Sequence, residues 1–209
     1  MTPWFSDSSY QQPDAYAAGK AECPFLVRAA TTVDLHDVAQ IITDSFHSPN
    51  GFWGWTLPIL RLGIYEDLRH RLASAAPHQF CLVAVDTTMG NHSLVGTVEL
   101  GVRYSDGWTH RSKSFVYLSN LAVHPMYRRQ GVASSLLVGC EKLTKEWGFK
   151  DIYLHVLENN HNARQLYFKL GYCVNKVEAG FNTFFFKRAP QILLHKHLSV
   201  NPESTSLNI

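Results

Sequence analysis

The spacing of apolar side chains along the chain predicts two helices near its start. Between residues 35 and 46, apolar side chains recur every three or four positions, as they do on one face of a helix. A second helix is expected from Pro58 to Ala73, because proline suits a first helical turn and one face of the segment is apolar. A short apolar run at residues 25–29 predicts a strand that precedes both helices.

Further along, the pattern becomes that of strands and then alternates between strands and helices. A long helix is predicted from Gly131 to Trp147, and Gly148 is placed to end it. A shorter helix follows and closes at Gly171. The strands are predicted at residues 79–86, 94–104, 115–123, 152–156, 172–177 and 181–187, of which the last two form a hairpin.

This order of elements contains both hairpins and crossovers. It indicates an α+β domain around one mixed, largely antiparallel central sheet flanked by about four helices. We expect this single domain to cover residues 25–190. Residues 1–24 are expected to be a disordered N-terminal tail, and residues 191–209 a C-terminal tail with a short apolar patch.

The charge balance of the chain argues against nucleic acid or membrane as a partner. The 209 residues carry 19 basic and 17 acidic side chains, a net charge of +2, which gives no strong overall field. The N-terminal segment lacks the basic start and apolar stretch of a signal peptide, and no apolar run is long enough to span a bilayer. We therefore expect a soluble protein, a monomer or weak dimer, in the cytoplasm.

The cysteines and histidines show no spacing typical of a metal site. The four cysteines form no C-x-x-C pair, and the 11 histidines form no H-x-x-x-H pair on a predicted helix. We interpret the cysteines as buried free thiols and expect no metal. This interpretation suits a reducing compartment.

The segment between the strand at residues 115–123 and the long helix is a candidate anion site. It reads Arg128-Arg129-Gln130-Gly131-Val132-Ala133. The first turn of a helix has backbone N–H groups without partners in the helix, and its dipole is positive there, so a pyrophosphate can bind. The alternative is a helix start that merely contains glycine and basic residues.

Two further segments accompany this loop and make the pattern more specific. One is the strand from Tyr117 to Val123 that leads into the loop, and the other is Asn160-x-x-Ala163-x-x-Leu166-Tyr167-x-x-x-Gly171-Tyr172. With the order of elements, they resemble the GNAT superfamily of acetyl-CoA-dependent N-acetyltransferases over residues 25–187. The resemblance implies the GNAT fold, with acetyl-CoA as co-substrate and no metal.

The resemblance also implies which residues bind the co-substrate. The backbone of residues 121–123 would hydrogen-bond the pantetheine arm as a strand partner does, and residues 128–134 would hold the pyrophosphate. Asn160 and Asn162, which follow the strand at residues 152–156, would bind the pantetheine arm where two strands separate. The implied set is Leu121, Ala122, Val123, Arg128, Arg129, Gln130, Gly131, Val132, Ala133, Ser134, Asn160, Asn162 and Tyr167.

Three residues are candidates for the proton transfers of amine acetylation. By resemblance, Tyr167 would protonate the departing thiolate; the alternative is a core aromatic. The strand at 152–156 is similar to that of NatE-type N-terminal acetyltransferases, where its histidine, here His155, acts through water with a strand tyrosine, here Tyr117. Imidazole accepts a proton near neutral pH. The alternative for His155 is a structural histidine of the sheet.

The acceptor is indicated only by resemblance. Residues 61–69 resemble plastid-type GNATs of plants and their cyanobacterial relatives, which acetylate protein N-termini and lysines, while some relatives acetylate arylalkylamines. The aromatic residues 52–55 and the helix from Pro58 would form one wall of the acceptor groove. The sequence thus predicts an enzyme that acetylates protein or peptide amines in a ternary complex, located in the plastid stroma if a transit peptide was removed.

Two alternatives stay open. One is an acetyltransferase for small amines such as arylalkylamines. The other is an acetyl-CoA-binding module without activity, although the presence of Tyr167 argues against a pure binder, which needs no proton donor at the sulfur.

Overall fold

The computed structural model describes residues 25–46, 57–73, 78–88, 93–104, 114–178 and 190–199. Most helices and strands predicted from apolar spacing are present there, with ends shifted by one or two residues. In chain order they are β1 (Phe25–Ala29), α1 (Leu35–Phe46), α2 (Leu57–Ala73), β2 (Gln79–Asp86), β3 (Ser93–Tyr104), β4 (Ser114–Val123), α3 (Val132–Glu146), β5 (Asp151–Leu157), α4 (His161–Lys169), β6 (Cys173–Glu178) and β7 (Gln191–His197).

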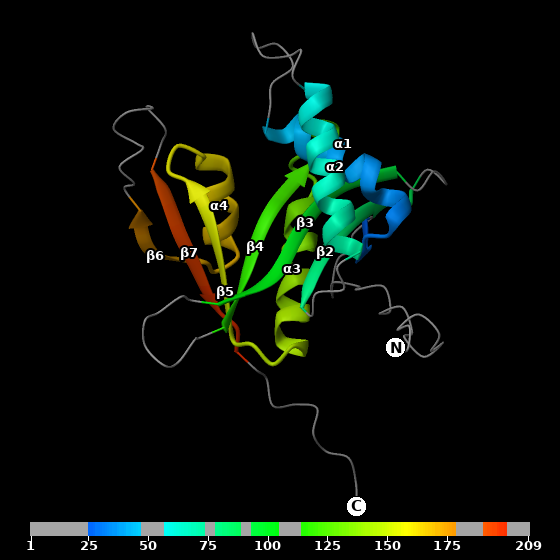
Figure 1. Cartoon of the computed structure of the whole chain (residues 1–209). Helices are drawn as coiled ribbons and strands as arrows, with labels where there is room; N and C mark the ends of the chain where they lie inside the picture. The colour runs from blue at the N-terminus through cyan, green and yellow to red at the C-terminus, as the bar shows by residue number, and fades with distance from the viewer. Residues whose placement is uncertain are drawn as a thin grey trace, which may run out of the picture.

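The described strands form one sheet in the order β1-β2-β3-β4-β5-β7-β6. Strands β1 to β4 are antiparallel neighbours, β4 and β5 are parallel, and β5, β7 and β6 are again antiparallel. The expected mixed, largely antiparallel sheet is therefore confirmed. Figure 1 shows β4 and β5 at the middle of this sheet.

The prediction of a tail from residue 191 was wrong, because β7 lies inside the sheet between β5 and β6. Ile192 and Leu194 are 4% and 0% exposed and belong to the main core. Their alternation over a short run was a weak sign of a strand, and pairing with two neighbours stabilises it. The strand predicted at residues 181–187, which was expected to form a hairpin with β6, lies outside the described residues.

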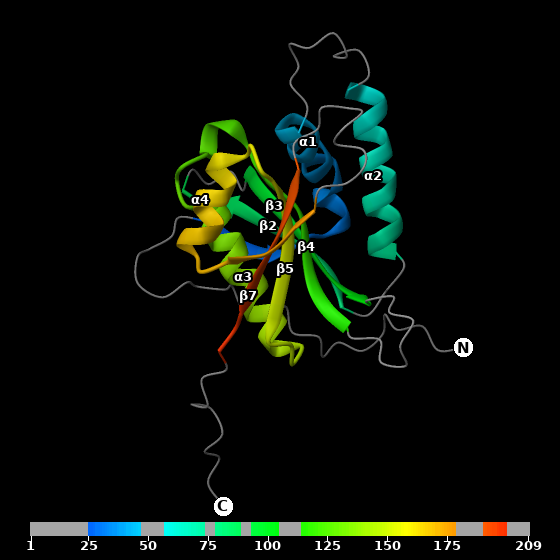
Figure 2. The ribbon, with the colours of Figure 1, turned by 90° about the vertical axis from the view of Figure 1, so that its left-hand side faces the viewer.

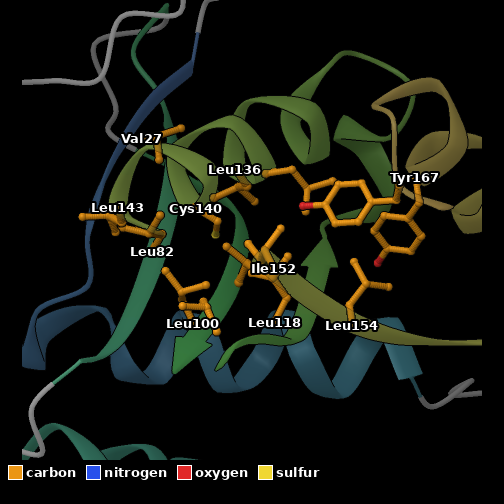
Figure 3. Packing of buried hydrophobic residues seen from close by; sticks show 14 of the residues in the cluster. Val27, Leu82, Leu100, Leu118, Leu136, Cys140, Leu143, Ile152, Leu154 and Tyr167 are labelled. Carbon is orange, nitrogen blue, oxygen red and sulfur yellow. The ribbon is translucent and has the colours of Figure 1, made fainter. Parts of the chain in front are cut away.

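Two layers of helices cover the two faces of the sheet. Figure 2 shows α3 and α4 on one side of the sheet and α1 and α2 on the other. The larger core lies under α3, where Leu136 and Cys140 pack over Leu82 and Ile152 (Figure 3). Alternate residues of the same strands, such as Val83 of β2, pack against α1 and α2 on the opposite face.

The cysteines of the described residues are free thiols, as expected, but not all are buried. Cys81 and Cys140 are buried in the two cores, whereas Cys173 is exposed. Cys173 begins β6, the edge strand of the sheet, whose residues 173–177 are all exposed. Expecting all of them to be buried was therefore wrong for this residue.

Gly96 in β3 allows α3 to lie close to the sheet. A Cβ atom at this position would lie 2.8 Å from Cγ1 of Val132 and 3.2 Å from Cδ1 of Leu136 and from the carbonyl oxygen of Ala122. Such distances leave no room for a side chain. Because Val132 is the first residue of α3, this contact fixes where the helix begins relative to β3 and β4.

We expect Gly96→Val to destabilise the protein by about 1–3 kcal/mol, because overpacking forces α3 away from the sheet. Urea denaturation measures the change in the free energy of unfolding. The control is Gly101→Ala in the same strand, where the nearest atom to a Cβ lies 3.9 Å away. An equal loss of stability in both variants would contradict the close-packing argument.

Candidate active site

The parallel strands β4 and β5 separate after a short region of pairing. Only Val116, Tyr117 and Leu118 of β4 pair with β5, opposite Ile152, Tyr153 and Leu154. Figure 1 shows the two strands diverging toward their C-terminal ends. Beyond Leu118, β4 stays paired with β3 on one edge, and no described strand pairs with its other edge. The residues predicted to pair with the pantetheine arm, 121–123, lie along this open edge.

A β-bulge marks the point where β4 leaves β5. The register with β3 shifts between Thr97 and Glu99, so that β4 has one extra residue there. Asn120 occupies the extra position with φ of 52°, in the left-handed region that asparagine tolerates better than most residues. The bulge thus changes the direction in which the following residues face.

A buried carboxylate holds the bulge. Glu99 is 6% exposed; its Oε1 accepts from Nδ2 of Asn120 at 2.9 Å, and its Oε2 accepts from Arg71 of α2 at 2.7 Å. Glu99, Arg71 and Asn120 were not among the site residues predicted from the sequence. An acidic residue within the apolar run of β3 was the available sign, because buried charges need partners.

The start of α3 has the features of an anion site. Gly131 is the N-cap residue with φ of 92°, and a Cβ there would meet nothing within 4 Å. The N–H groups of the first turn, residues 132–134, have no partners within the helix. Side chains of the preceding loop support its shape: Nε of Arg128 donates to the carbonyl of Val123, and Gln130 donates to that of Met126. This donor set fits a pyrophosphate.

Asn160 has a structural role at the start of α4. Its Oδ1 accepts from the backbone N–H of Ala163 at 3.2 Å, so it caps the helix. Asn162 lies exposed in the first turn of the same helix. Only the amide nitrogen of Asn160 thus stays available to donate to a ligand while the cap is formed.

Tyr167 of α4 is buried at the end of the main core, near Leu154 (Figure 3). It is 7% exposed, and its ring contacts that of Tyr172 edge-on, with 5.7 Å between centroids. Burial raises the pKa of Tyr167 to about 12, and the neighbouring Tyr117 and Cys140 add to the rise. Its hydroxyl is therefore protonated at neutral pH.

Tyr117 and His155 meet directly on the opposite face of the sheet. The Tyr117 hydroxyl lies 2.8 Å from Nδ1 of His155, within hydrogen-bond distance. The residues beside His155, Leu154 and Val156, are buried on the α3 side, as the strand pattern predicted. The pair and Tyr167 therefore flank the point of strand separation from opposite sides.

The predicted site residues of the described ranges thus lie on β4, the start of α3, β5 and the start and middle of α4. The aromatic residues 52–55, expected to line an acceptor groove, lie outside the described residues. Within the described ranges, no group of three or more His, Cys, Asp or Glu side chains is arranged to hold a metal ion. No helix in those ranges is long and apolar enough to cross a membrane.

The model of the acetyltransferase (GNAT) family matches residues 35–172, which include β4, the loop before α3, and α4. The chain belongs to the GNAT family. It is accordingly an acetyltransferase that uses acetyl-CoA, and the resemblance found in its sequence is confirmed.

Curated relatives of this GNAT protein occur in Arabidopsis thaliana. GCN5-related N-acetyltransferase 10, chloroplastic, is 28% identical over 179 residues, which cover 79% of this chain and 68% of the relative. GCN5-related N-acetyltransferase 7, chloroplastic, is 33% identical over 86 residues, which cover 41% of this chain and 31% of the relative.

Solved structures confirm the GNAT fold. NAA60 of Arabidopsis thaliana, in complex with a bisubstrate analogue, has a TM-score of 0.61 at 19% identity and covers 84% of this chain and 99% of its own. PaiA N-acetyltransferase of Thermoplasma acidophilum, in complex with coenzyme A, has a TM-score of 0.62 at 17% identity. It covers 83% of this chain and 98% of its own. At these identities the likeness concerns the fold alone.

Proposed function

We propose that this GNAT acetyltransferase transfers the acetyl group of acetyl-CoA to amines of proteins or peptides. The acceptors would be N-terminal α-amino groups, lysine ε-amino groups or both, attacking the thioester directly in a ternary complex. The observation that carries the proposal is the Tyr117–His155 pair, 2.8 Å apart at the end of β4–β5 pairing. This pair would provide a proton acceptor for an amine that enters the gap from the α1–α2 side.

Acetyl-CoA would lie on the α3–α4 side of the gap. The start of α3 offers donors and open space for the pyrophosphate at Gly131, and the open edge of β4 offers backbone groups at residues 121–123. The amide nitrogens of Asn160 and Asn162 would contact the arm. When bound, acetyl-CoA supplies the thioester carbonyl that the amine attacks.

His155 would accept the proton of the incoming amine. Amines react only when neutral, and a lysine amine titrates near ~10.4, so a lysine needs a base more than an α-amine, which titrates near ~8. Tyr117 contacts Nδ1 of the imidazole. If Nδ1–H donates to the Tyr117 oxygen, the buried Nε2 would be the nitrogen that accepts the proton, directly or through water.

Tyr167 would stabilise the departing thiolate by donating a hydrogen bond. Its pKa is raised to about 12 by burial, whereas a thiol titrates near ~8.5. The tyrosine is the weaker acid of the two, so sharing its proton is easier than complete transfer. A hydrogen bond of this kind is stronger in the transition state than before it, as catalysis requires.

Relatives and neighbours support a protein acceptor. The Arabidopsis relatives are N-acetyltransferases named as chloroplastic, and one structural neighbour is the NatC complex bound to a Gag peptide and CoA. From the names of these relatives we also propose a location in the plastid stroma rather than the cytoplasm. Import of the protein into isolated chloroplasts tests that location.

We expect Gly131→Glu to weaken acetyl-CoA binding by about tenfold or more, since the new carboxylate would lie against the pyrophosphate. Titration calorimetry measures the affinity. The matched control is Gly148→Glu at the other end of α3, where φ is 79° and a Cβ also meets nothing within 4 Å. If both variants bind acetyl-CoA as the parent does, the pyrophosphate site lies elsewhere.

We expect Tyr167→Phe to lower kcat by about 10²-fold, because it removes the hydroxyl and keeps the ring packing. The control is Tyr172→Phe, which removes a hydroxyl from the adjoining ring at 5.7 Å and should leave kcat nearly unchanged. Release of free CoA measures both rates. Equal effects of the two substitutions would mean that Tyr167 is only a core residue.

We expect His155→Gln to flatten the acidic limb of the kcat/KM profile, because that limb reports a base on the free enzyme. His195→Gln is the control, since His195 lies on the adjacent strand β7 and bonds Asp151 instead. An acceptor of lower amine pKa is measured in parallel. An acidic limb that persists in the His155 variant and follows the acceptor would assign the limb to the substrate. If the parent protein binds acetyl-CoA but releases no free CoA with any acceptor, it is a binding module without activity.

A further inference from the structure

A groove of about 320 Å³ lies beside Tyr117 on the α1–α2 face of the sheet. Its floor comes from β3 and β4, where Gly101 is the register partner of Tyr117 and Glu99 that of Ser119. Arg71 near the end of α2 closes one side. The groove therefore begins at the ring of a residue that contacts His155, the proposed base.

Gly101 keeps the floor of the groove bare. The atoms nearest to a Cβ built there are the carbonyl oxygen of His78 at 3.9 Å and Cγ of Gln79 at 4.0 Å. A larger side chain thus fits the backbone but extends into the groove. The space beside Tyr117 exists because this strand position has no side chain.

The two arginines that line the groove differ in their partners. Arg71 forms ion pairs with both Glu99 and Asp67, and Asn120 donates to the other oxygen of Glu99. Arg103 stacks over the Tyr117 ring, with 3.8 Å between Cζ and the ring centroid, and forms no ion pair with any carboxylate in the described ranges. Among the described residues, Arg103 is thus the groove arginine that has no carboxylate partner.

We propose that this groove binds the acceptor and that Arg103 recognises a carboxylate on it. The acceptor class is then a peptide with an acidic side chain close to the amine that is acetylated. The stacked guanidinium is held in plane by the ring, and its donors match a carboxylate in a bidentate manner. This inference rests on the proposed function, because it names the acceptors of the same site.

The test compares three acceptors with the full chain and acetyl-CoA, through the rate of CoA release. They are a peptide with Glu near its N-terminus, the same peptide with Gln at those positions, and tryptamine. We expect the acidic peptide to exceed the neutral one by about tenfold in kcat/KM, as charged hydrogen bonds typically give. Equal values for the two peptides would overturn the role of the groove and leave the proposed function standing.

Substitutions at Arg103 test whether this residue is the source of the preference. Arg103→Gln should bring the ratio of the two kcat/KM values close to one, and Arg103→Glu should favour a peptide with Lys at the same positions. The ratio between acceptors cancels any general loss of activity caused by disturbing Tyr117. A ratio that Arg103→Glu leaves unchanged would assign recognition to another residue and overturn the proposal.

A larger side chain at Gly101, on the floor of the groove, tests separately whether the acceptor binds there. Gly101→Leu should raise KM for both peptides and leave the acetyl-CoA affinity unchanged, whereas Gly101→Ala should have a smaller effect. Unchanged KM values in a folded Gly101→Leu protein would overturn the groove as the acceptor site. If tryptamine exceeds every peptide in the parent enzyme, the proposed function itself is wrong.

Discussion

The functional architecture depends on the limited pairing between β4 and β5. Three positions of parallel pairing hold the two halves of the sheet together, and beyond Leu118 the strands separate. Backbone groups at a sheet edge need hydrogen-bond partners, so an open edge inside the protein is suited to a ligand that can replace a strand. The start of α3 lies next to this edge, because Gly96 lets Val132 approach β3 closely.

The same separation distributes the proposed chemistry over two faces of the sheet. Tyr167 lies with the α3–α4 core, whereas Tyr117 and His155 lie on the α1–α2 face. A sheet keeps such groups apart, and only where two strands diverge can both reach one ligand. Donor and acceptor of the acetyl group would thus arrive from opposite sides and meet in the gap, with no need for a large conformational change.

Glu99 connects these parts although it takes no part in the proposed chemistry. Its carboxylate holds Asn120 in the bulge and Arg71 of α2, so the wall of the proposed acceptor groove and the open edge of β4 share one support. Removing one partner of a buried charge costs more than the pair contributes, which makes this site sensitive to substitution. Because Glu99 holds Arg71, Arg103 is the groove arginine that would contact a carboxylate of the acceptor.

Local patterns in the sequence determined most of the helices and strands, the family, and the candidates Gly131, His155 and Tyr167, since capping residues, strand alternation and motif spacing act over a few residues. The tertiary structure alone decided the place of β7, the partners of Glu99 and the groove over Gly101. These features depend on residues far apart in the chain that strand pairing brings together. Register and close packing, which set those contacts, are not encoded in any short stretch of sequence.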